Sequence, residues 1–295
     1  SSGNVTSGII NWDKIKYIDE KQHLEMQKRV SPQLNDILLA KNGTTGVADK
    51  CAPSQQGLKE SQMLLTKLLL AGYVVVAPDY EGLGAEGNHP FLNLKSEAFS
   101  ITDAVVATHD YLRLQGKKVA PQWMTIGHSQ GGHAALGAAQ YASRAQLDYK
   151  GTIAIAPASN LSAILLGGEA LAVGKPAAVQ SYIYSPLDAF TLLIVDGMQG
   201  HKTSVDYSTV FKGNLATLIP TIKGECFDVI KDKIQVDMSD FSIANGNSLE
   251  NYGRTQTGFM ALPQIDTFLN KTSQPLSAKV STPVIIYQGG SDQTV

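Results

Sequence analysis

The sequence feature that most constrains this chain is a serine set among glycines, Gly127-His128-Ser129-Gln130-Gly131-Gly132. An apolar run ending at Ile126 precedes it, and small residues at helical spacing follow over 133–142. This pattern predicts a strand, a sharp turn and a helix. In such a turn the backbone is strained, flanking glycines avoid clashes, and the serine hydroxyl is lifted above the sheet. We interpret Ser129 as a nucleophile, and the alternative is a plain structural turn.

Apolar strands and amphipathic helices alternate on both sides of this turn. Continuous β-branched runs are typical of parallel strands buried on both faces, so we expect an α/β fold with a mostly parallel central sheet flanked by helices. The expected strands are 73–78, 122–126, 151–157 and 283–287. The expected helices are 58–70, 96–114 and 133–142.

The alternation breaks down between residues 158 and 277, which is far longer than a usual crossover connection. We interpret 158–277 as a largely helical cap inserted over the site, 1–157 as the N-terminal part of the core, and 278–295 as the return to the core. The apolar side chains of the insertion either line an acyl pocket or, as we expect for any one of them, form the cap's own core. They are Phe190, Leu192, Leu193, Ile194, Phe211, Leu215, Leu218 and Ile219.

Net charge and hydropathy argue against nucleic-acid binding and against a membrane-spanning segment. The 295 residues carry a net charge of −2 with no basic run, which argues against nucleic acid. No apolar stretch reaches the roughly 18 to 20 residues of a transmembrane segment. The first residues lack the charged and apolar regions of a signal peptide, so we expect that any such peptide was removed or never present. Oligomeric state is not set by these features.

Carboxylates and cysteines each leave two interpretations. Asp79 and Glu81 follow the strand 73–78, where a carboxylate more often anchors loop N–H groups than takes part in catalysis. Cys51 and Cys226 lie too far apart in the sequence for a local metal knuckle. They either pair in a disulfide or remain buried thiols.

Two candidate oxyanion donors accompany the serine. The N–H of Gln130, at the start of the expected helix, points toward a developing oxyanion. The Gly- and Thr-rich loop 42–46 follows a short apolar run and stands where a second donor, from Thr44 or Thr45, would face Ser129. The alternative for this loop is a solvated turn, because Asn-Gly is a strong turn signal.

Asp292 is the candidate acid, because it stands just past the late strand 283–287. A carboxylate there would hold an imidazole in the right tautomer, although a turn aspartate is the alternative. A serine nucleophile needs a histidine base, and all six histidines precede Asp292. His128 and His133 flank the turn and are expected to point beside or behind Ser129. We expect the base, with a last strand and helix, to lie beyond Val295.

Five motifs together resemble the secretory lipase family of α/β-hydrolases. They are Asn-Gly-Thr-Thr-Gly at 42–46, Cys-Ala-Pro-Ser at 51–54, Ala-Pro-Asp-Tyr-Glu-Gly-Leu-Gly at 77–84, Gly-His-Ser-Gln-Gly-Gly at 127–132 and Gln-Gly-Gly-Ser-Asp at 288–292. The resemblance covers about 37–295. It implies an α/β-hydrolase fold and a secreted carboxylic-ester hydrolase with an ester or lipid substrate, which could meet a lipid–water interface. It implies no metal and no organic cofactor.

The resemblance also implies roles for individual residues. Ser129 would be the nucleophile, Asp292 the triad acid, and Gln130 N–H one oxyanion donor, with Thr44 and Thr45 supplying the other. A family cysteine matches Cys51 and pairs with one in the cap, which implies a disulfide to Cys226. One departure is Asn42, where related bacterial members often carry histidine. The competing functions are a serine peptidase or other acyl hydrolase on the same fold, and a binding module that has lost catalysis.

Overall fold

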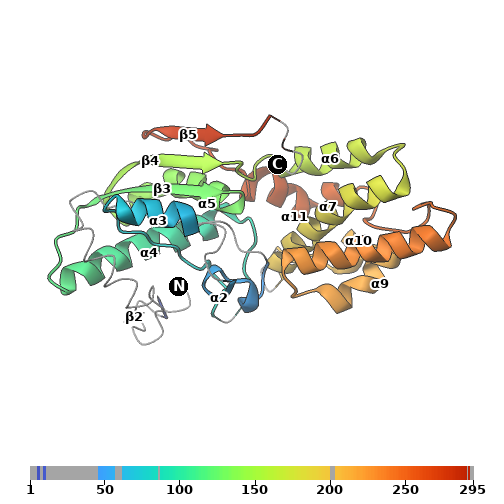
Figure 1. Ribbon diagram of the computed structural model, residues 1–295, viewed down its shortest axis with the longest axis horizontal. Coiled ribbons are helices and arrows are strands. Elements are labelled where there is room, and N and C mark those ends of the chain that lie inside the picture. Colours follow the sequence, from blue (N-terminus) through green and yellow to red (C-terminus); the bar gives the residue numbers. More distant parts are fainter. Residues whose placement is uncertain are drawn as a thin grey trace.

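The computed structural model describes residues 5–6, 9–10, 46–56, 62–85, 87–199, 203–290 and 292. Figure 1 shows two parts side by side: a sheet with its helices, and a region made of helices. The predicted second oxyanion donors, Thr44 and Thr45, lie outside the described residues.

The described sheet has three parallel strands in the order β3, β4, β5. They are β3 (Gln122–His128), β4 (Asp148–Ile155) and β5 (Val284–Tyr287). In the register of the sheet, His128 lies beside Ile155, which in turn lies beside Tyr287. The three strands therefore end together at one edge. A separate antiparallel pair is formed by β1 (Val5–Thr6) and β2 (Ile9–Ile10).

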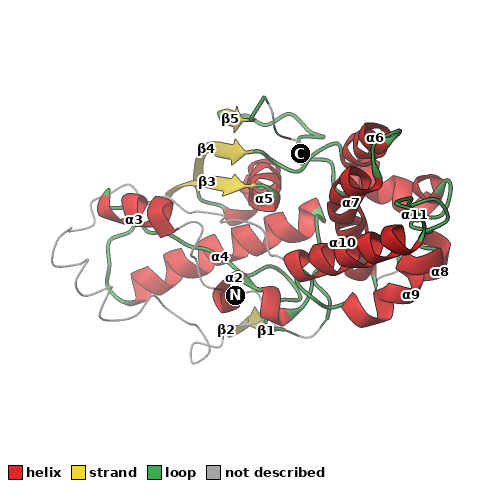
Figure 2. Ribbon diagram, turned by 45° about the vertical axis from the view of Figure 1, so that its right-hand side comes forward, coloured by secondary structure: helices red, strands yellow, loops and turns green. Residues whose placement is uncertain are grey.

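The helices beside the sheet match the predicted ones closely. They are α3 (Gln62–Leu70), α4 (Leu94–Leu114) and α5 (Gln130–Gln140), preceded by η3 (Asp49–Cys51) and α2 (Pro53–Gln56). Helix α5 packs against β3 and β4, and α4 packs against α5 (Figure 2). The small residues of α5 permit this, since a Cβ at Gly137 would lie only 3.1 Å from the carbonyl oxygen of Leu94. The predicted parallel sheet flanked by helices is thus confirmed for these strands.

Segment 73–78 departs from the prediction of a central strand. It pairs with no described strand. Its valines are half-buried, and Val76 packs against the core of the sheet part. An apolar β-branched run becomes a strand only when another backbone lies beside it to complete the ladder. The described residues supply no such neighbour at this place.

The region from 158 to 277 is largely helical in its described residues. Its elements are α6 (Leu161–Ala172), α7 (Ala177–Met198), α8 (Tyr207–Val210), α9 (Gly213–Ile222), α10 (Phe227–Ala244), η6 (Phe259–Ala261), α11 (Pro263–Thr267) and η7 (Phe268–Thr272). Helix α7 packs against both α6 and α10. The apolar side chains that the sequence left open between pocket and core belong to the core of this region: Leu192, Leu193, Ile194, Phe211, Leu215 and Ile219 are buried, and Phe190 and Leu218 are packed against them.

Helix α7 is 22 residues long and apolar enough, by length and composition, to cross a membrane. This amends the sequence-based expectation that no stretch would pass that criterion. In the structure 56% of its most apolar window is buried inside the protein. A central helix of a packed helical region has the same character.

A disulfide between Cys51 and Cys226 joins the two parts, as the resemblance implied. Its Cα atoms are 5.5 Å apart, and the cysteines are separated by 175 residues in the sequence. Beside it, Lys50 Nζ lies 2.7 Å from Glu225 Oε2. The amide of Asn88 also donates to the carbonyl of Asp196, at 3.0 Å. The helical region is therefore fixed to the sheet part at several points.

Candidate active site

Ser129 occupies the turn between β3 and α5 with an unusual backbone. Its φ of 55° and ψ of −122° lie outside the regions that a residue with a Cβ normally adopts. The backbone is held in place from both sides: Ser129 N donates to Ile155 O at 2.9 Å, and Ser129 O accepts from Ala158 N at 3.3 Å. Such strain persists only where the surroundings enforce it, and it occurs most often at functional sites.

Gly132 explains how the helix starts so close to the strand ends. A Cβ on this glycine would lie 3.0 Å from Ile155 O, 3.1 Å from Pro157 Cα and 3.2 Å from Gly127 O. All three are backbone atoms, so they could not move aside cheaply. The second glycine after Gln130 therefore lets α5 begin directly over β3 and β4.

The hydroxyl of Ser129 is not used to hold the helix. Serine commonly caps a helix by accepting an N–H with its side chain. Ser129 is the residue before α5 but makes no such bond. Its side chain is half-buried, and the first N–H groups of α5, beginning with that of Gln130, have no partner within the helix. The arrangement combines a hydroxyl with backbone donors and the positive end of a helix dipole.

Behind the serine lies a buried polar network that the sequence did not reveal. Gln130 Nε2 donates to Glu97 Oε1 at 2.7 Å and lies 2.9 Å from His89 Nε2. Glu97 Oε2 lies 2.6 Å from His133 Nδ1. Glu97, His89 and His133 have no exposed surface. The signal for Glu97 was its place on the same face of a helix as Ile101, where a carboxylate is unexpected.

His89 takes one clear tautomer in this network. Its Nδ1 lies 3.0 Å from the carbonyl oxygen of Glu81, which can only accept, so Nδ1 carries the proton. Its Nε2 then accepts from Gln130. Burial lowers the pKa of His89, although the nearby Glu97 carboxylate opposes that effect. His89 is therefore a neutral ring that orients the Gln130 side chain.

The other histidines differ in their exposure and contacts. His133 is engaged with Glu97 and with Ser273 O, at 2.6 Å, and so is held away from the Ser129 hydroxyl. His128 is exposed. Within the described part of the chain, no histidine ring nitrogen is hydrogen-bonded to Ser129. His23 and His201 lie outside it.

Asp292 lies beyond the end of β5, at the same sheet edge as Ser129. Because His128, Ile155 and Tyr287 share one row of the sheet, the chain leaves β3 and β5 two strands apart, roughly 10 Å at normal strand spacing. Asp292 is exposed. Its N–H bonds Gly289 O at 3.2 Å, and its carboxylate accepts from Gln288 Nε2 at 3.1 Å.

The two carboxylates after segment 73–78 anchor neighbouring residues. Asp79 accepts from both the N–H of Ser54, at 3.0 Å, and its hydroxyl, at 2.5 Å. Glu81 accepts from Ser96 Oγ at 2.5 Å. The anchoring interpretation of Asp79 is therefore confirmed. The Cys-Ala-Pro-Ser segment owes its position to this bond as well as to the disulfide.

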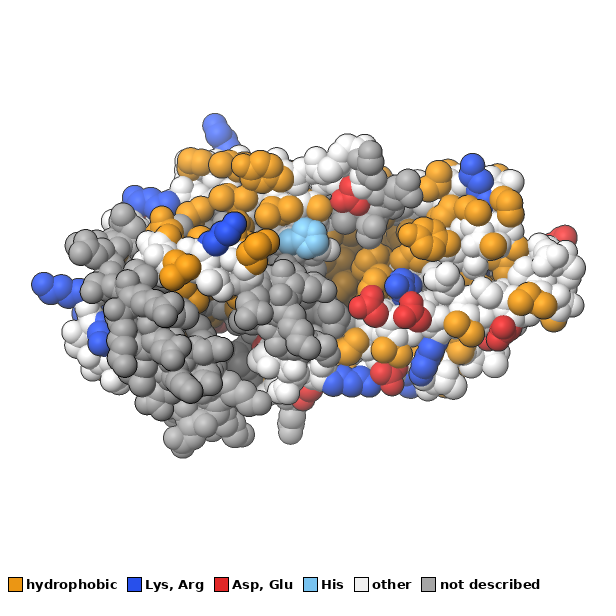
Figure 3. Space-filling view, viewed as in Figure 1, with side chains coloured by type: hydrophobic (Ala, Val, Ile, Leu, Met, Phe, Trp, Pro, Cys, Tyr) orange, Lys and Arg blue, Asp and Glu red, His pale blue; other side chains and the backbone are white. Residues whose placement is uncertain are grey.

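The face of the molecule drawn in Figure 3 is hollowed between the sheet part and the helical region. Hydrophobic side chains line this hollow, and a histidine lies at its edge (Figure 3). An apolar recess of this kind suits the binding of an apolar group. No group of three possible metal ligands occurs among the side chains that the structure describes.

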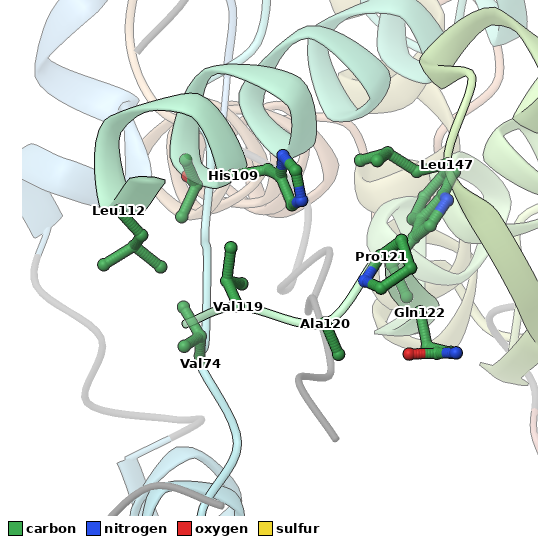
Figure 4. Close-up of a pocket in the computed structure, with 10 residues that line it drawn as sticks. Val74, His109, Leu112, Val119, Ala120, Pro121, Gln122 and Leu147 are labelled. Carbon is green, nitrogen blue, oxygen red and sulfur yellow. The ribbon is translucent and has the colours of Figure 1, made fainter. Parts of the chain in front are cut away.

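A separate, shallow pocket lies at the opposite end of β3. Figure 4 shows Val74, His109, Leu112 and Val119 around it. Gln122, which also lines it, is the first residue of β3, the strand that ends at His128. The pocket is therefore remote from Ser129 and is not its substrate site.

Comparison with known proteins agrees with this geometry. Residues 53–181 match the family described as secretory lipase. No curated protein sequence matches the chain. A putative hydrolase from Legionella pneumophila is 19% identical, with a TM-score of 0.68, over 90% of this chain and 68% of that one.

Two further structures are similar. The rice cell wall degrading esterase LipA from Xanthomonas oryzae is 18% identical, with a TM-score of 0.59, over 88% of this chain and 67% of that one. Candida antarctica lipase A in its closed state is 18% identical, with a TM-score of 0.60, over 90% of this chain and 60% of that one. At these identities the likeness shows a shared fold. The resemblance predicted from the motifs is confirmed, and over residues 53–181 the chain matches the secretory lipase family.

Proposed function

We propose that this protein is a carboxylic-ester hydrolase of the lipase and esterase kind, with Ser129 as its nucleophile. The observation that carries the proposal is the strained backbone of Ser129 at the end of β3, with a hydroxyl that is not used to cap α5. The secretory lipase match, which includes this residue, supports the same conclusion.

The proposed reaction forms and then breaks an acyl-enzyme. Ser129 Oγ attacks the ester carbonyl, and a histidine oriented by Asp292 takes the hydroxyl proton and returns it to the leaving alcohol. The N–H of Gln130 donates to the tetrahedral oxyanion, together with a second donor from Thr44 or Thr45. Water activated by the same base then attacks the acyl-enzyme and releases the acid.

We propose that region 158–277 is a cap over this site and that the apolar hollow in Figure 3 holds the acyl or alcohol part of the substrate. The hydrogen bond from Ala158 to Ser129 ties the start of this region to the nucleophile. Secretion fits the disulfide, because such bonds persist in oxidising compartments. A peptidase or other acyl hydrolase is the second candidate, since the same turn serves amides.

The experiment is hydrolysis of short and long p-nitrophenyl esters by the full-length protein and by Ser129→Ala. We expect the variant to lose about three orders of magnitude or more in kcat, because the covalent step is removed. A fluorophosphonate probe, followed by peptide mass analysis, should modify Ser129 alone. Ser162→Ala is the control, since that hydroxyl is bonded to Asn270 at 2.8 Å in the helical region.

The outcome of this experiment separates the candidates. Full labelling and full activity in Ser129→Ala would exclude Ser129 as the nucleophile. Labelling of Ser129 with amide but no ester turnover would favour a peptidase. No labelling and no turnover in the folded wild type would favour the non-catalytic binding module.

A further inference from the structure

Glu97 is a buried carboxylate that the proposed reaction does not use. It sits in the first turn of α4, on the face that also buries Ile101 and Val105, and it has no exposed surface. A buried charge is expensive unless it is paired, and an apolar side chain of similar size often serves packing equally well. The contacts of Glu97 should therefore indicate what it does.

Both carboxylate oxygens are engaged with the first turn of the helix that follows Ser129. Oε1 accepts from Gln130 Nε2 at 2.7 Å, and Oε2 faces His133 Nδ1 at 2.6 Å. Gln130 and His133 are the first and fourth residues of α5. One carboxylate thus holds both ends of the helical turn whose N–H groups face the proposed oxyanion.

The far side of His133 extends the network to the segment that follows η7. His133 Nε2 lies 2.6 Å from the carbonyl oxygen of Ser273, which can only accept, so Nε2 carries a proton. One further proton lies between Nδ1 and the Glu97 carboxylate. Both carboxylate oxygens of Glu97 and both ring nitrogens of His133 therefore have hydrogen-bond partners.

His89 also restrains the side chain of Gln130. The neutral ring accepts from Gln130 Nε2, and it is itself fixed by the bond from Nδ1 to Glu81 O. The side chain of Gln130 therefore cannot rotate without breaking bonds to both α4 and the loop that carries His89. The same restraint fixes the position of the Gln130 backbone N–H.

We propose that Glu97 is a positioning residue for the oxyanion donor: by binding Gln130 and His133 it fixes the first turn of α5 so that Gln130 N–H meets the charge formed at Ser129. This inference rests on the proposed function. Catalysis of this type depends on donors aligned in advance, and a displacement of about 1 Å can cost on the order of 100-fold in rate.

Three variants of the full-length protein test the proposal. Glu97→Gln removes the charge but can keep both bonds, since its amide oxygen accepts from Gln130 and its NH₂ donates to a neutral His133. Glu97→Ala removes both bonds. Gln130→Ala keeps the backbone N–H and the Glu97–His133 pair but releases the tie at position 130. Asp103→Asn is the control, because Asp103 is an exposed carboxylate on the same helix that pairs with Arg144.

The readout is kcat and KM for a p-nitrophenyl ester, with active sites counted by the fluorophosphonate burst so that unfolded protein does not contribute. We expect kcat per site to fall about 10- to 100-fold in Glu97→Ala and Gln130→Ala with KM within about threefold. Glu97→Gln should stay within about threefold of wild type in kcat, and Asp103→Asn should not change it.

A purely structural role would lower only the number of titrated sites. Unchanged kcat per site in Gln130→Ala would overturn the proposal, and this variant decides the matter if Glu97→Ala does not fold. A wild type that neither reacts with the probe nor turns over ester would instead refute the proposed function.

Discussion

At the scale of the residue, the proposed nucleophile Ser129 has a strained backbone. Ser129 has a positive φ, whereas most of the described residues with that sign are glycines. Its backbone N–H and C=O are both bonded to β4 and the segment after it, through Ile155 and Ala158. These bonds hold the conformation that lifts the hydroxyl out of the sheet.

We therefore predict that Ser129→Gly is more stable than Ser129→Ala by about 0.5–2 kcal/mol. Glycine adopts this backbone without a Cβ clash, and the relief of about 1–3 kcal/mol exceeds its larger loss of chain entropy, about 0.5–1 kcal/mol. Both variants should be inactive. The measurement is urea unfolding of each, with the free energies compared at equal m-values.

Ser239 supplies the matched control for this prediction. It lies inside α10 with an ordinary helical backbone. There the order should reverse, and Ser239→Ala should be more stable than Ser239→Gly by about 1 kcal/mol. Equal stability of the two Ser129 variants would mean that the turn is not strained.

At the scale of the element, the last turn of α7 lies very close to the loop that precedes α4. A Cβ on Gly197 would lie 2.6 Å from Phe91 N and 2.8 Å from His89 O. Both atoms belong to the loop that also orients Gln130 through His89. The last turn of α7 thus packs directly on backbone that supports the proposed site.

Gly197→Ala should destabilise the protein by about 1–3 kcal/mol, because backbone atoms cannot yield to a methyl group. Gly167→Ala is the control: Gly167 is exposed in α6, and a Cβ added there would meet no atom within 4 Å. There alanine should stabilise by about 0.5–1 kcal/mol through its helix propensity. Thermal unfolding of both variants is the measurement, and a Tm for Gly197→Ala at or above wild type would contradict the close contact.

At the scale of the whole molecule, buried apolar contacts and a disulfide hold the sheet part and the helical region together. Phe91 and Leu92, which precede α4, are buried in the core of the helical region with residues such as Leu192. The Cys51–Cys226 disulfide closes a loop of 175 residues between the parts. Cross-links across loops of this length restrict the unfolded chain strongly.

Removing the disulfide with the double variant Cys51→Ala/Cys226→Ala should lower the free energy of unfolding by about 2–5 kcal/mol. Reductant should destabilise the wild type by a similar amount and leave the double variant unaffected. Guanidinium unfolding with and without reductant measures both. A reductant effect of equal size in the double variant would show that it acts elsewhere.

The sequence by itself determined the local elements around the serine. Periodicity and turn chemistry predicted β3, α5, β4 and β5 with their ends placed to within three residues, because these signals depend on neighbours along the chain. The glycines around Ser129 predicted the sharp turn for the same reason. The motif resemblance implied the disulfide partner of Cys51.

Only the tertiary structure decided which distant groups meet. Segment 73–78 reads as a central strand, yet strand pairing depends on a neighbour that lies elsewhere in the sequence. Glu97 on α4, His89 in a loop and His133 on α5 carry no shared motif, and their meeting behind Gln130 depends on how α4 packs against α5. Hydrogen bonds between elements are fixed by packing in three dimensions, so local sequence could predict the serine's turn but not the network that supports it.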